Sequence, residues 1–402
     1  MKSPNPVKAD MKKIIYLTLI LTFNICYSQN EAEKLESNLS FFMGSEVENA
    51  EEQPEKEIIT LWESYLKEGK FQDNQSPFWS FDNMKIPDEY LWVVGVQNLD
   101  SREHKVQCKI IGVFPAEKNY YALKSAFTHI DKKGEIHLDT ITSVYAKKFG
   151  EKYLLISSAE YYKNVLEHHK IGNINYYVHP FHKFDLEKSK KMNEFNIFLA
   201  NEFNVEPMEF DYFVANNARD IVDIWGYEYM NKMYQPAQTG GVASIHNKLI
   251  YAGNNSEYYP HELVHLYTYD LVPKDYHFWI GEGIATFYGG SGGESLEWHL
   301  IKLKEFLEQN PAYDLSDIDK LKQIPNGEHF TDFRYVIGGF LMKKIYEKYG
   351  VKGFLEALQI EGGNVKEFHK SGSNDAYFTF LKEKLGIEKK DFDNYIKREI
   401  KN

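Results

Sequence analysis

Two histidines four residues apart, with a glutamate between them, constrain this chain more than any other feature. They are His261 and His265 in the sequence HELVH, and the glutamate is Glu262. On a helix, side chains four positions apart project from the same face, one turn apart. Two imidazole nitrogens placed in this way can bind one tetrahedral Zn²⁺, and Glu262 can take a proton from the water that the metal activates. The motif therefore predicts a zinc site on a helix.

A second acidic residue, Glu282, completes the predicted site. It lies in the segment WIGEGIA (residues 279–285), after a spacer of 16 residues (266–281) from His265. Glycines on both sides of Glu282 let the backbone pack close to a metal site. Two histidines and one glutamate leave the fourth position of a tetrahedral ion open for water, which is typical of catalytic zinc and not of structural zinc. We predict one Zn²⁺ per chain and hydrolytic chemistry.

These motifs resemble those of a known group of enzymes. HELVH followed by WIGEGIA is similar to the gluzincin metallopeptidases, and within them to the aminopeptidase N-like (peptidase MA-like) group, in which W-x-x-E-G-x-A follows HExxH after about 18 residues. Residues 335–338, YVIG, are similar to the Y-x-x-G of that group. The resemblance covers roughly residues 173–402 and implies a zinc metallopeptidase with a thermolysin-like zincin domain. It implies His261, His265 and Glu282 as metal ligands, Glu262 as general base and Tyr335 as the residue that stabilises the oxyanion.

The sequence departs from that group at one informative place. Its aminopeptidases carry a G-x-M-E-N segment, whose glutamate holds the free amino terminus of the substrate. The nearest counterpart here, GGVAS at residues 240–244, has no carboxylate and no asparagine. An entering ammonium group would find no anionic partner in this segment. We therefore expect an endopeptidase that hydrolyses internal bonds of a peptide or protein.

Two alternatives remain open from the sequence. The chain can be an aminopeptidase whose amine anchor comes from elsewhere, for example from Glu294 or from the N-terminal region. It can also be a non-catalytic envelope binding module on a zincin scaffold. The intact set of Glu262 and the three ligands argues against a scaffold, because scaffolding does not require all four residues together.

Composition and charge limit the class of protein further. The chain has 402 residues, of which 43% are hydrophobic and 15% aromatic, enough for a folded core and not typical of disorder. Its net charge of −12 and pI near 5.7 argue against nucleic acid as a general partner. No segment after the N-terminal region reaches transmembrane length, and the oligomeric state is not determined.

The N-terminal region is typical of a secretory signal. Lys12 and Lys13 precede a short apolar run at residues 14–25, and a small residue, Ser28, ends the expected cleavage site. Met11 offers an alternative start of translation. We therefore expect cleavage after residue 28 and a secreted, periplasmic or cell-envelope protein. Lipid anchoring at Cys26 is the alternative, although the residues before it lack the small side chain usual at such sites.

The pattern along the chain predicts an α+β protein in three parts. These are a signal peptide (residues 1–28), an α+β accessory domain (residues 29–172) and a zincin metallopeptidase domain (residues 173–402) with a mainly helical C-terminal part. In the accessory domain a flexible lead-in (residues 29–56) precedes one helix and an antiparallel meander. The helix is expected at residues 57–68, and the strands at residues 90–96, 106–114, 121–128, 141–149 and 153–157.

The zincin region has its own pattern of strands and helices. Strands are expected at residues 174–178, 210–214 and within 241–252, and helices at residues 185–203, 218–225, 296–309, 333–349 and 351–358. Other histidines, at residues 168–169 and at 179 and 182, lack acidic partners at metal spacing, and we interpret them as surface or strand-end residues. The glycine-rich segment at residues 289–293 is interpreted as a flexible hinge.

Overall fold

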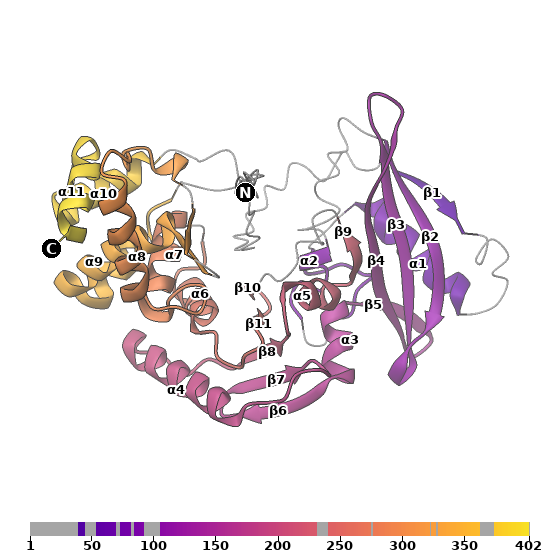
Figure 1. Cartoon of the computed structure of the whole chain (residues 1–402). Helices are drawn as coiled ribbons and strands as arrows, with labels where there is room; N and C mark the ends of the chain where they lie inside the picture. The colour runs from indigo at the N-terminus through magenta and orange to yellow at the C-terminus, as the bar shows by residue number, and fades with distance from the viewer. Residues whose placement is uncertain are drawn as a thin grey trace, which may run out of the picture.

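The computed structural model describes residues 39–44, 54–69, 73–81, 84–91, 105–230, 240–274, 276–321, 323–326, 329–361 and 374–401. Over these residues the chain is a mixed α+β protein. Two large sheets come from residues 39–253, and the part of the chain that follows is largely helical (Figure 1). This confirms the predicted fold class at the level of α+β. Among the described helices, none combines the length and the apolar character needed to span a membrane.

The first sheet has six strands and is covered by one helix. The strands β1 to β5 lie in sequence order, and β9 pairs with β4. Helix α1 buries Trp62 in a core shared with Cys108 and Leu123 of the sheet. The elements are β1 (Leu39–Met43), α1 (Glu55–Glu68), β2 (Lys105–Pro115), β3 (Tyr120–Ile130), β4 (Ile136–Phe149), β5 (Lys152–Ile156) and β9 (Tyr227–Met230).

Three predictions for this region were wrong in detail. The lead-in contains a strand, β1, and this strand runs parallel to β2, so the sheet is not wholly antiparallel. The strand expected at residues 90–96 begins instead within a short helix, α2 (Glu89–Leu91), and residues 92–96 lie outside the described part. Short elements such as β1 carry little periodicity, because their conformation depends on partners far along the chain.

The second sheet lies next to the helical part and has the strand order β10-β11-β8-β7-β6. Its two outer pairs are antiparallel and its two inner pairs parallel. Helix α4 makes the long crossover that parallel neighbours such as β7 and β8 require. The elements are α3 (Ser158–Val165), β6 (Glu167–Ile171), β7 (Ile174–Val178), α4 (Leu186–Phe203), β8 (Phe210–Val214), α5 (Ala218–Ile224), β10 (Gly240–Ser244) and β11 (Leu249–Gly253).

Alternate residues of this sheet face two different cores. On β8, Tyr212 packs in the large core with Leu263 and Val264, whereas its neighbour Phe213 packs with Tyr251 on the other face. The helix that carries the HELVH motif is therefore built into the main core, between the sheet and the C-terminal helices.

The C-terminal part consists of six helices and a small hairpin among the described residues. They are α6 (Pro260–Leu271), α7 (Phe278–Gly289), α8 (Leu296–Gln309), β12 (Gln323–Asn326), β13 (His329–Asp332), α9 (Phe333–Ala357), α10 (Asp375–Leu385) and α11 (Phe392–Lys401). Three short 3₁₀ turns complete the described elements: η3 (Glu117–Asn119), η4 (Ile318–Lys320) and η5 (Lys389–Asp391).

Helix ends show which local signals were reliable. Asp185 caps α4 as predicted, accepting the N–H groups of Glu187 and Lys188. Helix α9 runs on both sides of Gly350, whose φ of 58° and ψ of −156° are not helical. Two helical stretches therefore meet at this glycine, as the sequence predicted.

Pairings across the predicted domain boundary join the N-terminal and C-terminal regions. Strand β9 follows residue 173 in sequence yet pairs with β4, and β6 precedes it yet pairs with β7. Asn247 also accepts hydrogen bonds from the N–H groups of Lys85 (2.8 Å) and Ile86 (3.0 Å). The boundary between residues 172 and 173 stays a prediction.

Helices α7 and α9 approach closely where two glycines meet. A Cβ atom on Gly283 would lie 2.7 Å from the carbonyl carbon and oxygen of Gly338, and one on Gly338 would lie 3.2 Å from the Cα of Gly283. These are the glycines of the WIGEGIA and YVIG motifs. Their close contact brings Glu282 on α7 and Tyr335 on α9 toward the same region.

We expect Gly283→Ala to destabilise the protein by about 1–3 kcal/mol, because the added methyl group would meet backbone atoms that cannot rotate away. Urea unfolding followed by circular dichroism measures the change. Gly240→Ala is a matched control, since a Cβ there meets nothing within 4 Å. Equal stability of the two variants would show that the two helices can separate at little cost.

Candidate metal centre

Helix α6 holds both motif histidines and the glutamate between them inside the protein. Pro260 occupies the first turn, where its missing N–H group costs no helical hydrogen bond. His261 and His265 are 2% and 8% exposed, and Glu262 is 0% exposed. Leu263, Val264 and Leu266 join the core, so packing fixes the helix around them.

Helix α7 brings Glu282 to the two histidines. Its Oε2 atom lies 3.1 Å from Nε2 of His261 and 3.6 Å from Nε2 of His265, and the two Nε2 atoms are 3.2 Å apart. A tetrahedral zinc ion with ligand distances of about 2.0–2.2 Å separates its ligand atoms by about 3.3–3.6 Å. The three observed separations fit the edges of such a tetrahedron. The three residues could therefore bind a metal ion.

The orientation of His261 supports this assignment. Its Nδ1 lies 2.6 Å from the carbonyl oxygen of Gly290, an acceptor, so Nδ1 carries the proton and donates it. The lone pair of the neutral ring is then on Nε2, which faces His265 and Glu282. A hydrogen bond from the outer nitrogen to a carbonyl is the arrangement that orients metal-binding histidines.

The electrostatics of the three residues also require positive charge at their centre. Burial by itself would raise the pKa of Glu282, but His265 and His261 beside it hold the pKa of that carboxyl well below its usual range. Without a cation or added protons, lone pairs on three atoms would face one another across 3.1–3.6 Å. A divalent cation satisfies all three ligands at once.

Glu262 lies beside the three ligands without joining them. Its carboxylate is buried, and neither oxygen has a hydrogen-bond partner of good geometry within the described part of the chain. Burial raises the pKa of Glu262, while the two histidines and the backbone N–H of Ala243 on β10 act in the opposite direction. A buried carboxylate that no side chain holds has its oxygens left for another group in the site.

Tyr335, near the start of α9, reaches the same region. Its ring centroid lies 5.8 Å from that of His261, and the residue is 2% exposed. Burial and the nearby charge of Glu282 raise the pKa of Tyr335 well above its usual range. The phenol therefore keeps its proton at neutral pH and can act as a hydrogen-bond donor. Arg334 beside it forms a two-point contact with Asp332, at 2.9 and 2.6 Å, which holds the start of α9.

The glycine-rich segment after α7 is a tight turn, and its carbonyl at Gly290 accepts the hydrogen bond from His261. Gly290 has a φ of 72°, and a Cβ there would lie 2.1 Å from the carbonyl oxygen of Glu294. Backbone hydrogen bonds join Ser291 and Glu294 across the turn, and His299 contacts the Ser291 carbonyl at 2.8 Å. The interpretation of residues 289–293 as a flexible hinge missed this supporting role. The run of glycines is the sequence signal that could have indicated the tight turn.

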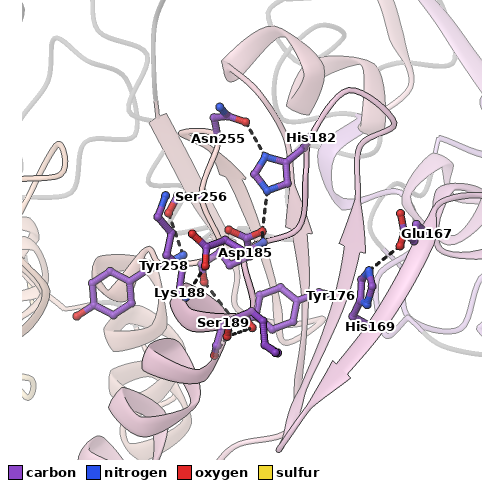
Figure 2. A network of polar contacts seen from close by, with 12 residues as sticks. Glu167, His169, Tyr176, His182, Asp185, Lys188, Ser189, Asn255, Ser256 and Tyr258 are labelled. Carbon is purple, nitrogen blue, oxygen red and sulfur yellow. Dashed lines mark hydrogen bonds and ion pairs between the residues drawn. The ribbon is translucent and has the colours of Figure 1, made fainter.

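A buried contact between a histidine and a carboxylate fixes the loop that leads into α6. Nε2 of His182 lies 2.6 Å from a carboxylate oxygen of Glu257, which also accepts the Asp185 N–H at the start of α4. Nδ1 of the same ring contacts Asn255 at 2.6 Å, as Figure 2 shows. The side chains of His182 and Glu257 are 7% and 0% exposed, so His182 has a buried acidic partner that its interpretation as a surface or strand-end residue did not include.

Another histidine, His277, supports α7 from its beginning. His277 is 0% exposed and caps the helix, accepting the Trp279 N–H at its Nδ1. Its Nε2 lies 2.8 Å from Oδ1 of Asn374, and its ring stacks on Tyr377 at 4.4 Å. Burial lowers the pKa of His277 to about 4. The neutral ring is therefore part of the native cap of α7. Residue spacing in the sequence did not indicate this role of His277.

Comparisons of the chain with protein-family models, with curated proteins and with solved structures give no match. The buried group of His261, His265 and Glu282, consistent with an HExxH…E zinc site on a helix, is therefore the finding from which function is argued.

We expect Glu257→Gln to lower the free energy of unfolding by about 3 kcal/mol, because it leaves the buried His182 without its charged partner. Zinc affinity, measured by chelator competition, should fall as well, since the loop into α6 loses its anchor. Glu167→Gln is the matched control: Glu167 pairs with His169 at 2.8 Å, but its side chain is 68% exposed (Figure 2). A loss in the control equal to that in Glu257→Gln would contradict the role of burial.

Protonation of His277 gives a second expectation. The folded pKa of about 4 lies below the ordinary value of 6.5, so the stability from the neutral ring is complete above pH 6.5 and declines toward pH 4. Between pH 7 and 5 the free energy of unfolding of the metal-free wild type should fall by about 2 kcal/mol more than that of the His277→Asn variant. The amide of asparagine can cap α7 but does not titrate. Chemical unfolding with a chelator present measures this, and parallel pH curves would contradict it.

Proposed function

We propose that the chain is a zinc-dependent peptidase of the gluzincin type that hydrolyses internal peptide bonds. One observation carries the proposal: the buried carboxylate of Glu262 makes no side-chain hydrogen bond within the described residues and lies beside three converging metal ligands. A purely structural zinc site would have a fourth protein ligand and no use for such a group. Secretion by means of a signal peptide at residues 1–28 is part of the same proposal.

His261, His265 and Glu282 would hold the zinc ion. When bound there, zinc would polarise the scissile carbonyl and make water acidic enough to attack near neutral pH. Glu262 accepts the proton of the attacking water and later donates it to the leaving amine. The protonated phenol of Tyr335 donates a hydrogen bond to the oxygen on which negative charge develops.

The neighbouring strand supports a peptide as the substrate. Strand β10 forms the edge of the second sheet and contacts α6. An extended peptide can bind such an edge through its main chain, which would place a bond beside Glu262. Residues 240–244 of β10 carry no acidic side chain, so this strand offers no anchor for a free amino terminus. This favours cleavage at internal bonds over removal of N-terminal residues.

A non-catalytic envelope binding module on a zincin scaffold is the second candidate. A scaffold would not explain why Gly290 orients His261 or why Glu262 is buried. Burying a carboxylate that no side chain holds costs stability. An aminopeptidase would require an acidic anchor from outside β10. We therefore give priority to the endopeptidase.

Glu262→Gln should keep one zinc ion and lose at least about 100-fold in peptide cleavage, because the amide cannot accept the proton of water. The assay uses purified residues 29–402, zinc and a mixed peptide library with blocked amino termini, and mass spectrometry identifies the cleaved bonds. Internal cuts by the wild type alone support the endopeptidase.

His265→Ala is the comparison variant in the same assay, and it should lose both zinc and activity. Loss of zinc in Glu262→Gln would contradict the assigned role of Glu262. Cleavage that appears only when the amino termini are unblocked would identify an aminopeptidase. Absence of cleavage from both blocked and unblocked peptides, with zinc bound, would favour the scaffold.

A further inference from the structure

A second group of potential metal ligands lies at the turn between β3 and β4, in the other sheet. This hairpin projects from one end of the first sheet (Figure 1). His129 and His137 are direct cross-strand partners in its register. Asp131, two residues after His129, and Glu135, two residues before His137, lie at the two ends of the connecting turn. Side chains two apart on a strand share one face, so the hairpin gathers imidazoles and carboxylates together.

The turn orients one oxygen of Asp131 toward His137. Its Oδ1 accepts the N–H groups of Lys133 and Glu135, at 2.8 and 2.9 Å. The other oxygen, Oδ2, lies 3.2 Å from Nε2 of His137. The backbone N–H of Glu135, with His137 and the N–H of Lys133, holds the pKa of Asp131 below its usual value. Asp131 is therefore a carboxylate throughout the neutral range.

Three ligand atoms converge in this group. One each from Asp131, Glu135 and His137 lie within 4.8 Å of one another. The separation of 3.2 Å between Asp131 and His137 is close to the edge of about 3.3–3.6 Å in a tetrahedral zinc site. An imidazole with two carboxylates suits zinc-like divalent ions, whereas calcium and magnesium prefer oxygen ligands alone.

A further pair of residues supports the imidazole of His137. The ring of His129 stacks on it with a centroid distance of 4.9 Å and an angle of 16°. Nδ1 of His129 is in turn held by both oxygens of Asp139, at 2.9 and 2.8 Å. Ligand histidines are commonly oriented by neighbours in this way. The stack limits rotation of His137 and keeps its Nε2 edge toward Asp131.

The local charge favours a cation. Three carboxylates, those of Asp131, Glu135 and Asp139, face two histidines, and Lys132 and Lys133 lie in the turn itself. With neutral histidines, the three carboxylates and the two lysines together carry one net negative charge. Two protonated histidines would reverse that balance and place like charges in stacked rings 4.9 Å apart. A divalent ion leaves His137 neutral and neutralises the carboxylates.

We propose that Asp131, Glu135 and His137 form a second, surface site for a zinc-like divalent ion, with His129 and Asp139 as positioning residues. Water would complete the coordination. The ion would tie the turn to the first residues of β4 and so hold the two strands together at their free end. This site is independent of the metal centre on α6 and of any activity there.

The test counts zinc ions bound by the full chain. Metal-free protein is titrated with zinc against a chromophoric chelator, for the wild type and for His137→Asn, Asp131→Asn and His265→Ala. The wild type should bind two equivalents. Each hairpin variant should lose the hairpin equivalent, or bind it at least tenfold more weakly, and keep the equivalent on α6. His265→Ala should lose the equivalent on α6 and keep the hairpin equivalent. Asp131→Asn retains the Oδ1 acceptor, so the turn itself should persist.

His168→Asn serves as the matched control, because His168 also lies on a strand and stacks on an aromatic ring, that of Tyr177, at 5.1 Å. It should keep both equivalents. Amide exchange of residues 131–137 should slow when zinc is added to the wild type and to His265→Ala. If the wild type binds a single equivalent and His265→Ala removes it, the proposal is overturned. The hairpin would then hold two ordinary imidazole–carboxylate pairs, His137 with Asp131 and His129 with Asp139. Persistence of the second equivalent in both hairpin variants would overturn it as well.

Discussion

The convergence of three lone pairs in a buried space is the constraint on which the candidate metal centre depends. Nε2 of His261, Nε2 of His265 and a carboxylate oxygen of Glu282 lie 3.1–3.6 Å apart, inside the main core. Buried polar atoms of like character repel unless a cation lies between them. The surrounding structure keeps them in place: the Gly290 carbonyl orients His261, and His277 caps the helix that carries Glu282. A metal ion bound by these three residues would therefore couple its binding to folding.

Close backbone approach makes this geometry possible. Gly283 and Gly338 let α7 and α9 meet, and a Cβ on Gly289 would lie 2.5 Å from the backbone nitrogen of His261. The glycines thus set the distances among three helices that together supply the ligands, the candidate base and the candidate tyrosine. On the other side, the buried pair of His182 and Glu257 connects the loop before α6 to the start of α4. Rigid elements position the site, as accurate metal geometry requires.

Much of this was predictable from the sequence, and the failures follow a pattern. Periodicity located β7, β8 and α8 at their observed bounds, because each is long or apolar enough to carry its own signal. The strand β1 and the helix α10 were not predicted, since their conformation depends on distant partners. The acidic partner of His182 was missed for the same reason: Glu257 is 75 residues away in sequence. A spacing rule cannot detect such a pair.

The sequence by itself determined the chemistry that is available: two histidines on one helical face, an acidic residue between them and another in a glycine-flanked segment. These follow from the 3.6-residue period of a helix, which is local and therefore readable. Only the tertiary structure decided how closely Glu282 approaches the two histidines, that Glu262 is buried beside them, and that β10 lies against α6. Those outcomes depend on how helices and sheets pack across long stretches of chain, because packing distances are set by contacts between residues far apart in sequence.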